Sequence, residues 1–203
     1  MPSPEELKAQ IIAPVHNLLA QHAGAELHIT GHSLGAAMAV LSGAHFQTQE
    51  NIDVHQLYTF GLPRVGDANF SKWFHENLPG AIHVTHYHDV RMGMLPRCLV
   101  TSLGPYLPRR CRFQIVPHLP PQWLFGYHHT PTEVWYTQET GLEYKVCDGS
   151  GEDPTCADSV HFWDYSAKDH CHYLDYPICG CVKTAADGSV KPGARPTSKV
   201  IST

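Results

Sequence analysis

The stretch LHITGHSLGAAMAVL, Leu27 to Leu41, constrains this chain more than any other. It passes from alternating β-type residues into an alanine-rich helical run, with Gly-His-Ser-Leu-Gly at the junction. This fits G-x-S-x-G, the nucleophile elbow, in which a serine occupies a tight strand-to-helix turn. We expect a Cβ atom at Gly31 or Gly35 to collide with the strand or the helix, so both positions require glycine. The pattern predicts that the Ser33 hydroxyl lies above the carboxyl end of a sheet.

The same turn predicts where the site would stabilise negative charge. Leu34 is expected to begin the helix, so its backbone N–H would point at a substrate oxygen instead of making a helical hydrogen bond. The helix N-terminus adds a partial positive charge at the same point. Leu34 is therefore our candidate for one donor of an oxyanion hole.

Strands and helices alternate along the chain. Apolar patterning predicts strands at 27–30, 53–60, 81–87, 133–137 and 142–146, and helices from Pro4 onward, at 33–45 and at 68–78. A capping box, Ser3-x-x-Glu6, marks the start of the first helix. One face of this helix is predicted to pack inward through Leu7, Ile11, Val15, Leu18 and Leu19. The order predicts an α/β fold, a mostly parallel sheet with helices on both faces.

Composition narrows the class of protein. The 203 residues include 14 Lys and Arg against 19 Asp and Glu, and this net charge of −5 argues against a nucleic-acid partner. No apolar run approaches the roughly 18 residues of a membrane-spanning helix. The first ten residues show neither the basic nor the apolar region of a signal peptide. The seven cysteines, in contrast, suggest an oxidising compartment.

A nucleophilic serine needs a base, and the base needs a carboxylate that orients it. In α/β-hydrolases the acid follows the serine along the chain and precedes the histidine. The stretch HVTHYHD places Asp89 directly after the third predicted strand, where this acid is expected. Asp67 is the nearest rival, but RVGDANF makes it the predicted N-cap of the following helix.

At this point the chain resembles the class 3 lipase family, the fungal lipase and feruloyl esterase type of α/β-hydrolase. The matching stretches are ITGHSLGAAMAVLSG, YTFGLPRVGDANF, VPHLPP, HHTPTEVWY and DHCHY, which cover most of the chain from Leu7 to Tyr173. The resemblance implies a serine carboxyl-ester hydrolase that acts on lipid esters of the triacylglycerol type, at a lipid–water interface. Two alternatives stay open: a feruloyl esterase-type activity, and a catalytically inactive fragment or binding module on a hydrolase scaffold. The sequence does not set the oligomeric state.

The resemblance also implies the base, a histidine that follows an aspartate and precedes a tyrosine by three positions. DHCHY assigns this role to His170, with His172 as the second choice and His161 as the third. No catalytic role is assigned to His32, His45, His86, His88, His128 or His129.

The cysteines are expected to form disulfides instead of binding metal. The resemblance implies that Cys147 and Cys156 close the loop DGSGEDPT, and it leaves the pairing of Cys171, Cys179 and Cys181 open. The stretch DHCHYLDYPICGC carries two His and three Cys, but their spacing is too close for the usual zinc patterns. No metal or cofactor is expected.

The chain departs from the family pattern in two places. The family carries further strands, a lid and a second oxyanion donor before the first helix, so we expect an N-terminally truncated lipase domain at 1–181. The full-length product would be extracellular, with its signal peptide in the absent part. Residues 91–115, with five arginines and no acid, interrupt the family pattern and are interpreted as a retained intron or a genuine basic loop. Residues 182–203 are expected to be a disordered tail.

Overall fold

The computed structural model of the chain describes residues 4–89, 120, 122–123, 125–160 and 169–179. Its helices and strands, in chain order, are α1 (Pro4–Gln21), β1 (Leu27–His32), α2 (Leu34–Thr48), β2 (Val54–Phe60), β3 (Gly66–Asp67), α3 (Ala68–Asn77), β4 (Ile82–His86), β5 (Tyr127–His128), β6 (Glu133–Tyr136), β7 (Tyr144–Val146), η1 (Ala157–Ser159), η2 (Asp169–Cys171), β8 (His172–Tyr173) and β9 (Tyr176–Pro177). The insert expected at 91–115 and the tail expected at 182–203 lie outside the described residues.

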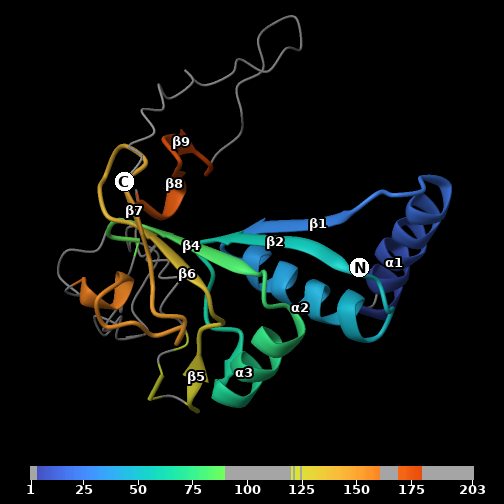
Figure 1. Cartoon of the computed structure of the whole chain (residues 1–203), viewed down its shortest axis with the longest axis horizontal. Coiled ribbons are helices and arrows are strands. Elements are labelled where there is room, and N and C mark those ends of the chain that lie inside the picture. The colour runs from blue at the N-terminus through green and yellow to red at the C-terminus, as the bar shows by residue number, and fades with distance from the viewer. Residues whose placement is uncertain (1–3, 90–119, 121, 124, 161–168, 180–203) are drawn as a thin grey trace, which may run out of the picture.

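The centre of the fold is a five-stranded sheet in the order β1-β2-β4-β6-β7 (Figure 1). The first four strands pair in parallel, as the alternation of strands and helices predicts, and β7 returns antiparallel to β6. The carboxyl ends of parallel strands meet at one edge of the sheet, so the residues that follow β1 and β4 are brought together there. Two short pairs, β3 with β5 and β8 with β9, complete the described strands.

Helices α2 and α3 lie on the same side of the sheet, and the core lies between them and the strands (Figure 1). Its buried members are Ala36, Val40, Ala44, Leu57, Leu62, Phe74, Leu78 and Ala81. Small residues let α2 approach the sheet closely: a Cβ atom at Gly43 would lie 2.4 Å from Leu57 Cδ1. The alanine-rich run that follows the predicted elbow is therefore a requirement of helix–sheet packing.

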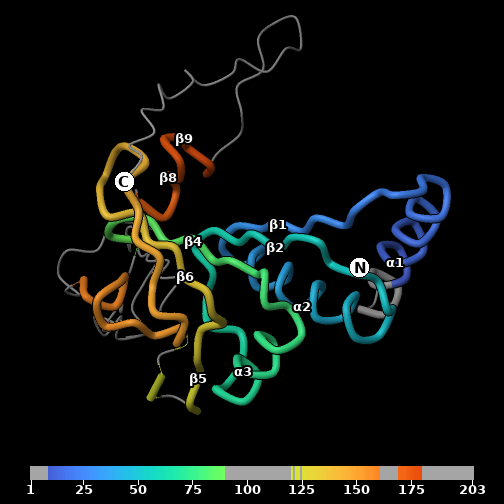
Figure 2. Tube along the Cα trace, viewed as in Figure 1, coloured from blue at the N-terminus to red at the C-terminus, as the bar shows by residue number. Residues whose placement is uncertain are grey.

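The first helix corrects one prediction. Helix α1 begins at Pro4 as expected, but none of its residues from 9 to 21 is buried. Ile11 and Leu18, predicted to pack inward, are 52% and 55% exposed. The physical reason is the position of α1 beyond the amino ends of β1 and β2, where it does not lie over the core (Figure 2). Among the described contacts, a hydrogen bond between His16 Nε2 and Glu50 Oε2, 2.9 Å long, ties it to the rest of the fold.

Helix α3 confirms the role predicted for Asp67. The Asp67 carboxylate accepts a hydrogen bond of 2.9 Å from the backbone N–H of Phe70, which caps the first turn. This side chain is therefore committed to the helix N-terminus and is not available as the acid of the predicted site. Within the described residues, no helix has the length and apolar character needed to cross a membrane.

Candidate active site

Ser33 lies on the turn between β1 and α2 with φ 59° and ψ −128°. A positive φ at a residue other than glycine is strained, and strain of this kind is concentrated at functional sites. The turn is held by its backbone, because Ser33 N–H donates to Phe60 O at 3.0 Å and Ser33 O accepts from Ala36 N–H at 2.9 Å. Serine at the start of a helix usually caps it, but the Ser33 hydroxyl makes no capping hydrogen bond. Its Oγ is thus free of the ordinary structural role of a serine at this position.

The two glycines of the turn are not equivalent, which corrects the prediction that both are needed for space. A Cβ atom at Gly31 would lie 2.3 Å from Gly35 O and 2.8 Å from the Ala36 nitrogen. A Cβ atom at Gly35 would meet nothing within 4 Å among the described residues outside its own helix. The reason is that Gly31 lies against the first turn of α2, while the Cβ direction of Gly35 points away from the strand. Glycine is therefore required at position 31 for β1 to approach α2 so closely. Gly35 takes part in this contact through its backbone carbonyl.

Asp89 and His170, the predicted acid and base, are in direct contact. Asp89 follows β4, and its Oδ1 accepts a hydrogen bond of 2.8 Å from His170 Nδ1 in η2. The second carboxylate oxygen accepts a hydrogen bond from the hydroxyl of Tyr173, the tyrosine three positions after His170. All three side chains are buried, with exposed fractions of 3% for Asp89, 7% for His170 and 2% for Tyr173. The arrangement fixes the histidine with its proton on Nδ1 and its Nε2 available as a base.

The other nitrogen of His170 is buried. Among the described residues, His170 Nε2 has no hydrogen-bond partner. A buried nitrogen without a partner is costly in a protein and is common where a reacting group will bind. A base that is oriented by a buried carboxylate and open at Nε2 is poised to take a proton from a neighbouring hydroxyl.

His32 also lies at the site, although no catalytic role was expected for it. Its ring lies against that of His170, with centroids 4.6 Å apart, and its Nε2–H donates to His170 O at 2.8 Å. Because His32 precedes Ser33 directly, this contact joins the serine turn to the segment that carries the base. The only signal in the sequence was its place in the variable position of G-x-S-x-G, which does not report a contact across the fold.

The electrostatics of the site follow from its burial. Burial raises the pKa of Asp89 above its usual value, although the hydrogen bonds from His170 and Tyr173 oppose this shift. Burial and the Asp89 charge raise the pKa of Tyr173 well above 10, so its hydroxyl stays a donor. Burial also lowers the pKa of His32, which favours the neutral ring. All three shifts follow first from burial, and the hydrogen bonds from His170 and Tyr173 favour the ionised form of Asp89.

Gly61 lets the chain pass close to the base. It has φ +57°, and a Cβ atom there would lie 2.8 Å from His170 Cε1 and 2.9 Å from the Tyr173 hydroxyl oxygen. Its backbone N–H donates to Val84 O at 3.0 Å, which holds this turn at the end of the sheet. Any other amino acid at position 61 would be strained by this backbone conformation, and its Cβ atom would displace His170.

The structure describes two of the three remaining predicted site residues. Leu34, the predicted oxyanion donor, is the first residue of α2 and its side chain is 72% exposed. His172, the second choice for the base, lies in β8 with its ring 5.9 Å from that of His86 and does not bond to Asp89. His161, the third choice, lies outside the described residues.

Two disulfides are present among the described cysteines. Cys147 pairs with Cys156, the pair that the family resemblance implied. Cys171 pairs with Cys179, which answers the pairing left open by the sequence. This second disulfide begins one residue after His170, and it closes the β8–β9 hairpin beside the base. Cys181 lies outside the described residues.

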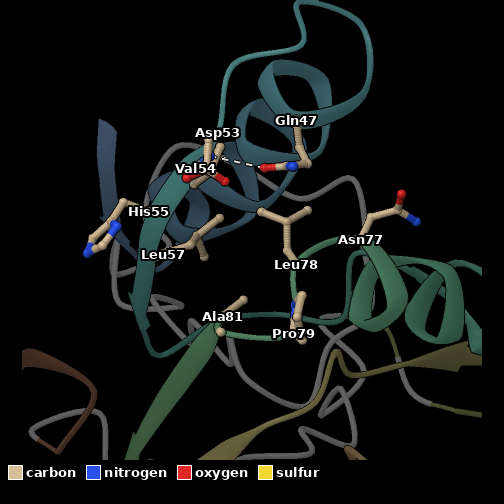
Figure 3. A pocket seen from close by; sticks show the side chains of 10 residues that line it. Gln47, Asp53, Val54, His55, Leu57, Asn77, Leu78, Pro79 and Ala81 are labelled. Atoms are coloured by element: carbon tan, nitrogen blue, oxygen red, sulfur yellow. Dashed lines mark hydrogen bonds between the residues drawn. The ribbon is translucent and has the colours of Figure 1, made fainter. Parts of the chain in front are cut away.

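A pocket of about 220 Å³ lies at the other end of the sheet (Figure 3). Gln47 from α2, Leu57 from β2 and Leu78 after α3 line it, and a hydrogen bond of 3.0 Å from Val54 N–H to Gln47 Oε1 closes one side. These residues lie toward the amino end of β2, whereas Ser33 bonds to Phe60 at its carboxyl end. The pocket is therefore separate from the candidate active site.

The chain is similar in sequence to known lipases. The family model described as Lipase (class 3) matches residues 3–98. The chain is 30% identical over 173 residues to a lipase of Rhizomucor miehei, covering 83% of this chain and 40% of that protein. It is 32% identical over 190 residues to lipase ZK262.3 of Caenorhabditis elegans, covering 88% of this chain and 52% of that protein. The chain thus spans about half the length, or less, of these curated relatives.

Solved structures show the same relationship. One, titled as a triacylglycerol lipase whose catalytic centre is formed by a serine protease triad, superposes with a TM-score of 0.66 at 26% identity. The match covers 87% of this chain and 58% of that chain. Lipase II from Rhizopus niveus gives a TM-score of 0.65 at 26% identity over 86% of this chain and 57% of that chain. On its sequence, its parallel sheet and its serine turn together, the chain belongs to the class 3 lipase family of α/β-hydrolases.

Proposed function

We propose that the chain is a serine carboxyl-ester hydrolase that acts on lipid esters of the triacylglycerol type. The observation that carries this proposal is the buried pair of His170 and Asp89, beside a serine on a strained turn whose hydroxyl makes no capping hydrogen bond. Among the described residues, His170 Nε2 has no hydrogen-bond partner. The proposal is supported by the family, since the relatives and the solved structures it matches are lipases.

The proposed reaction assigns one role to each residue. Ser33 Oγ attacks the carbonyl carbon of the ester while His170 Nε2 takes the hydroxyl proton. The Leu34 N–H, at the positive end of α2, donates to the oxygen that becomes negatively charged. His170 then gives its proton to the leaving alcohol, and an acyl group remains on Ser33. Water, activated by the same histidine, releases the fatty acid and restores the serine.

Asp89 and Tyr173 support the histidine through this cycle. The Asp89 carboxylate stabilises the imidazolium form of His170 and keeps its ring in the productive orientation. Tyr173 donates to the other carboxylate oxygen, so Asp89 has no freedom to rotate away. His32 positions the backbone of the same segment through His170 O. In this proposal Asp89, Tyr173 and His32 position His170 and do not touch the substrate.

We also propose that the protein acts outside the cell, at a lipid–water interface. Two relatives are named secreted mono- and diacylglycerol lipases, from Fusarium solani and Malassezia globosa. The disulfides Cys147–Cys156 and Cys171–Cys179 agree with an oxidising compartment.

The test compares the wild-type chain with Ser33→Ala on short p-nitrophenyl esters and on emulsified triacylglycerol. We expect kcat to fall on the order of 10⁶-fold, the loss found when a serine hydrolase loses its nucleophile. Ser42→Ala, a change of the same kind farther along α2, is the matched control and should leave kcat unchanged. Equal rates for wild type and Ser33→Ala would refute the proposal for this chain. Turnover of methyl ferulate without turnover of lipid esters would favour the feruloyl esterase-type activity.

A further inference from the structure

A cluster of two histidines and one glutamate lies at the amino end of the sheet. Glu26 precedes β1 by one residue, His28 is the second residue of β1, and His55 is the second residue of β2. One ligand atom from each of the three comes within 4.8 Å of the other two. None of them belongs to the site around Ser33, since the strand rises about 3.3 Å per residue and Ser33 is 33 − 28 = 5 residues, about 16 Å, farther along.

An irregularity in the sheet brings these side chains to one face. Leu27 pairs with Val54 but His28 pairs with Gln56, so His55 is an extra residue in β2 opposite this break. A bulge of this kind turns the extra side chain out of the normal alternation. Leu57 faces α2, where it lies close to Gly43. His55 lies on the opposite face of β2, as Figure 3 shows. Glu26 and His28, two residues apart in extended chain, share a face as well.

The distances fit the ligands of one metal ion. Glu26 Oε2 lies 3.2 Å from His28 Nε2 and 3.3 Å from His55 Nε2. Ligands at the usual 2.0–2.2 Å from a tetrahedral Zn²⁺ are about 3.3 Å apart. The distances from Glu26 Oε2 to the two histidine nitrogens therefore match two edges of such a tetrahedron. Two histidines and one glutamate are also a donor set that Zn²⁺ takes, with the fourth position left to water.

A second His–Glu–His cluster in this chain has a different geometry. Glu50 bonds His16 through Oε2 and His45 through Oε1, each at 2.9 Å. There each histidine has its own carboxylate oxygen, at hydrogen-bond length, and the ring nitrogens do not converge on one point. This cluster is not among the groups whose ligand atoms gather around a common position.

His28 has a polar partner on each ring nitrogen. Its Nδ1 lies 3.0 Å from Gln56 Oε1, and its Nε2 lies 3.2 Å from Glu26 Oε2. A carbonyl oxygen on the outer nitrogen is the usual support of a metal-bound histidine.

We propose that Glu26, His28 and His55 bind one divalent transition-metal ion of the Zn²⁺ class. The three side chains are 44% to 52% exposed, so an ion can enter from solvent and keep a water ligand. The site joins β2 to the chain just before β1 and would stabilise the amino end of the sheet. Its role is structural, because it lies far from the proposed nucleophile.

To test this, the full chain carrying Ser33→Ala is titrated with Co²⁺ at pH 8. Binding is followed by the visible absorption of tetrahedral cobalt. We expect one strong Co²⁺ site, from which Zn²⁺ displaces Co²⁺. His28→Gln and His55→Gln should each weaken Co²⁺ binding at least about tenfold. The matched control is His16→Gln, which opens the Glu50 cluster and should leave the affinity unchanged.

A second measurement keeps the result independent of folding defects. Zn²⁺ should raise the melting temperature of wild type and of His16→Gln but not of His28→Gln/His55→Gln. Circular dichroism spectra of the variants should match wild type without metal. If His28→Gln/His55→Gln binds Co²⁺ as tightly as wild type, or if His16→Gln loses binding equally, the proposed site is wrong.

Discussion

Glu133 is a carboxyl group that the fold holds away from water. It is 5% exposed, and its Oε1 accepts a hydrogen bond of 2.5 Å from Thr85 Oγ1. Burial is the main reason that its pKa rises from 4.5 to about 7, and nearby Asp158 adds to the shift. The folded protein therefore binds a proton here that the unfolded chain releases near pH 4.5.

This difference predicts how stability changes with pH. Between about pH 4.5 and pH 7 the folded state holds more protons than the unfolded state, so the contribution of Glu133 is lost as pH rises. The shift of about 2.5 units corresponds to about 3 kcal/mol. Glu133→Gln keeps an acceptor for Thr85 and removes the charge, so we expect this variant to be more stable than wild type at pH 8 and to lose most of this pH dependence.

Urea denaturation at pH 5, 6, 7 and 8 measures the effect. Glu143→Gln is the control, because Glu143 carries an exposed carboxylate hydrogen-bonded to Gln138. A free energy of unfolding that falls equally with pH in wild type and Glu133→Gln would show that other groups cause the dependence.

At the scale of the element, the start of α2 depends on one of its two glycines. Gly31→Ala would place a Cβ atom 2.3 Å from Gly35 O, so β1 and α2 must move apart. We expect a loss of about 1–3 kcal/mol in the free energy of unfolding. Gly35→Ala meets open space in a helix and should gain up to about 1 kcal/mol.

Urea denaturation of the two variants, side by side, checks this difference. Each change adds the same methyl group only a few residues from the other, so neither composition nor hydrophobicity separates them. Equal effects of Gly31→Ala and Gly35→Ala would mean that the close approach of strand and helix does not control this turn.

Local patterns predicted the elements well and their packing less well. Helices α2 and α3 and strands β1, β2 and β4 appear where periodicity placed them, with bounds that differ by up to three residues. The apolar spacing of α1 predicted a buried face that its described residues do not have. A helical period reports which residues share a face, but not whether another element covers that face. Pairs such as β3 with β5 are too short to leave a pattern.

At the scale of the whole molecule, two disulfides stabilise different regions. Cys147–Cys156 closes a loop next to β7, and Cys171–Cys179 closes the hairpin that follows His170. Loops of this length predict a loss of about 2–3 kcal/mol for each bond removed. We expect Cys171→Ser/Cys179→Ser to lower kcat/KM as well, because His170 and Tyr173 lie on the released segment, and Cys147→Ser/Cys156→Ser to lower stability alone.

The two pairs are compared by melting temperature and by ester hydrolysis at 20 °C. If both double variants lose stability but keep the same kcat/KM, the hairpin does not position the base. Wild type treated with a reductant should combine both effects.

The sequence predicted Ser33 from its motif, Asp89 from its place after a strand, and His170 from the family resemblance. The structure brings Asp89 and His170 into contact. No role was expected for His32, whose contact with His170 joins segments 138 residues apart. The sequence left Cys171 without a partner, since two later cysteines had similar spacing. The bulge at His55 was also invisible, because a shift in strand register depends on pairing and not on the pattern of one strand.

The site draws its parts from distant points of the chain. Ser33 follows β1, Asp89 follows β4, and His170 comes after β7, so Ser33 and its proposed base are 137 residues apart in the sequence. No fragment that contains only the early strands can hold both, and pairing over such separations is slow because a long loop must close first. On the proposed function, ester hydrolysis is therefore expected to be a late signal in refolding. It should return after secondary structure and serve as a stricter measure of the native state than circular dichroism.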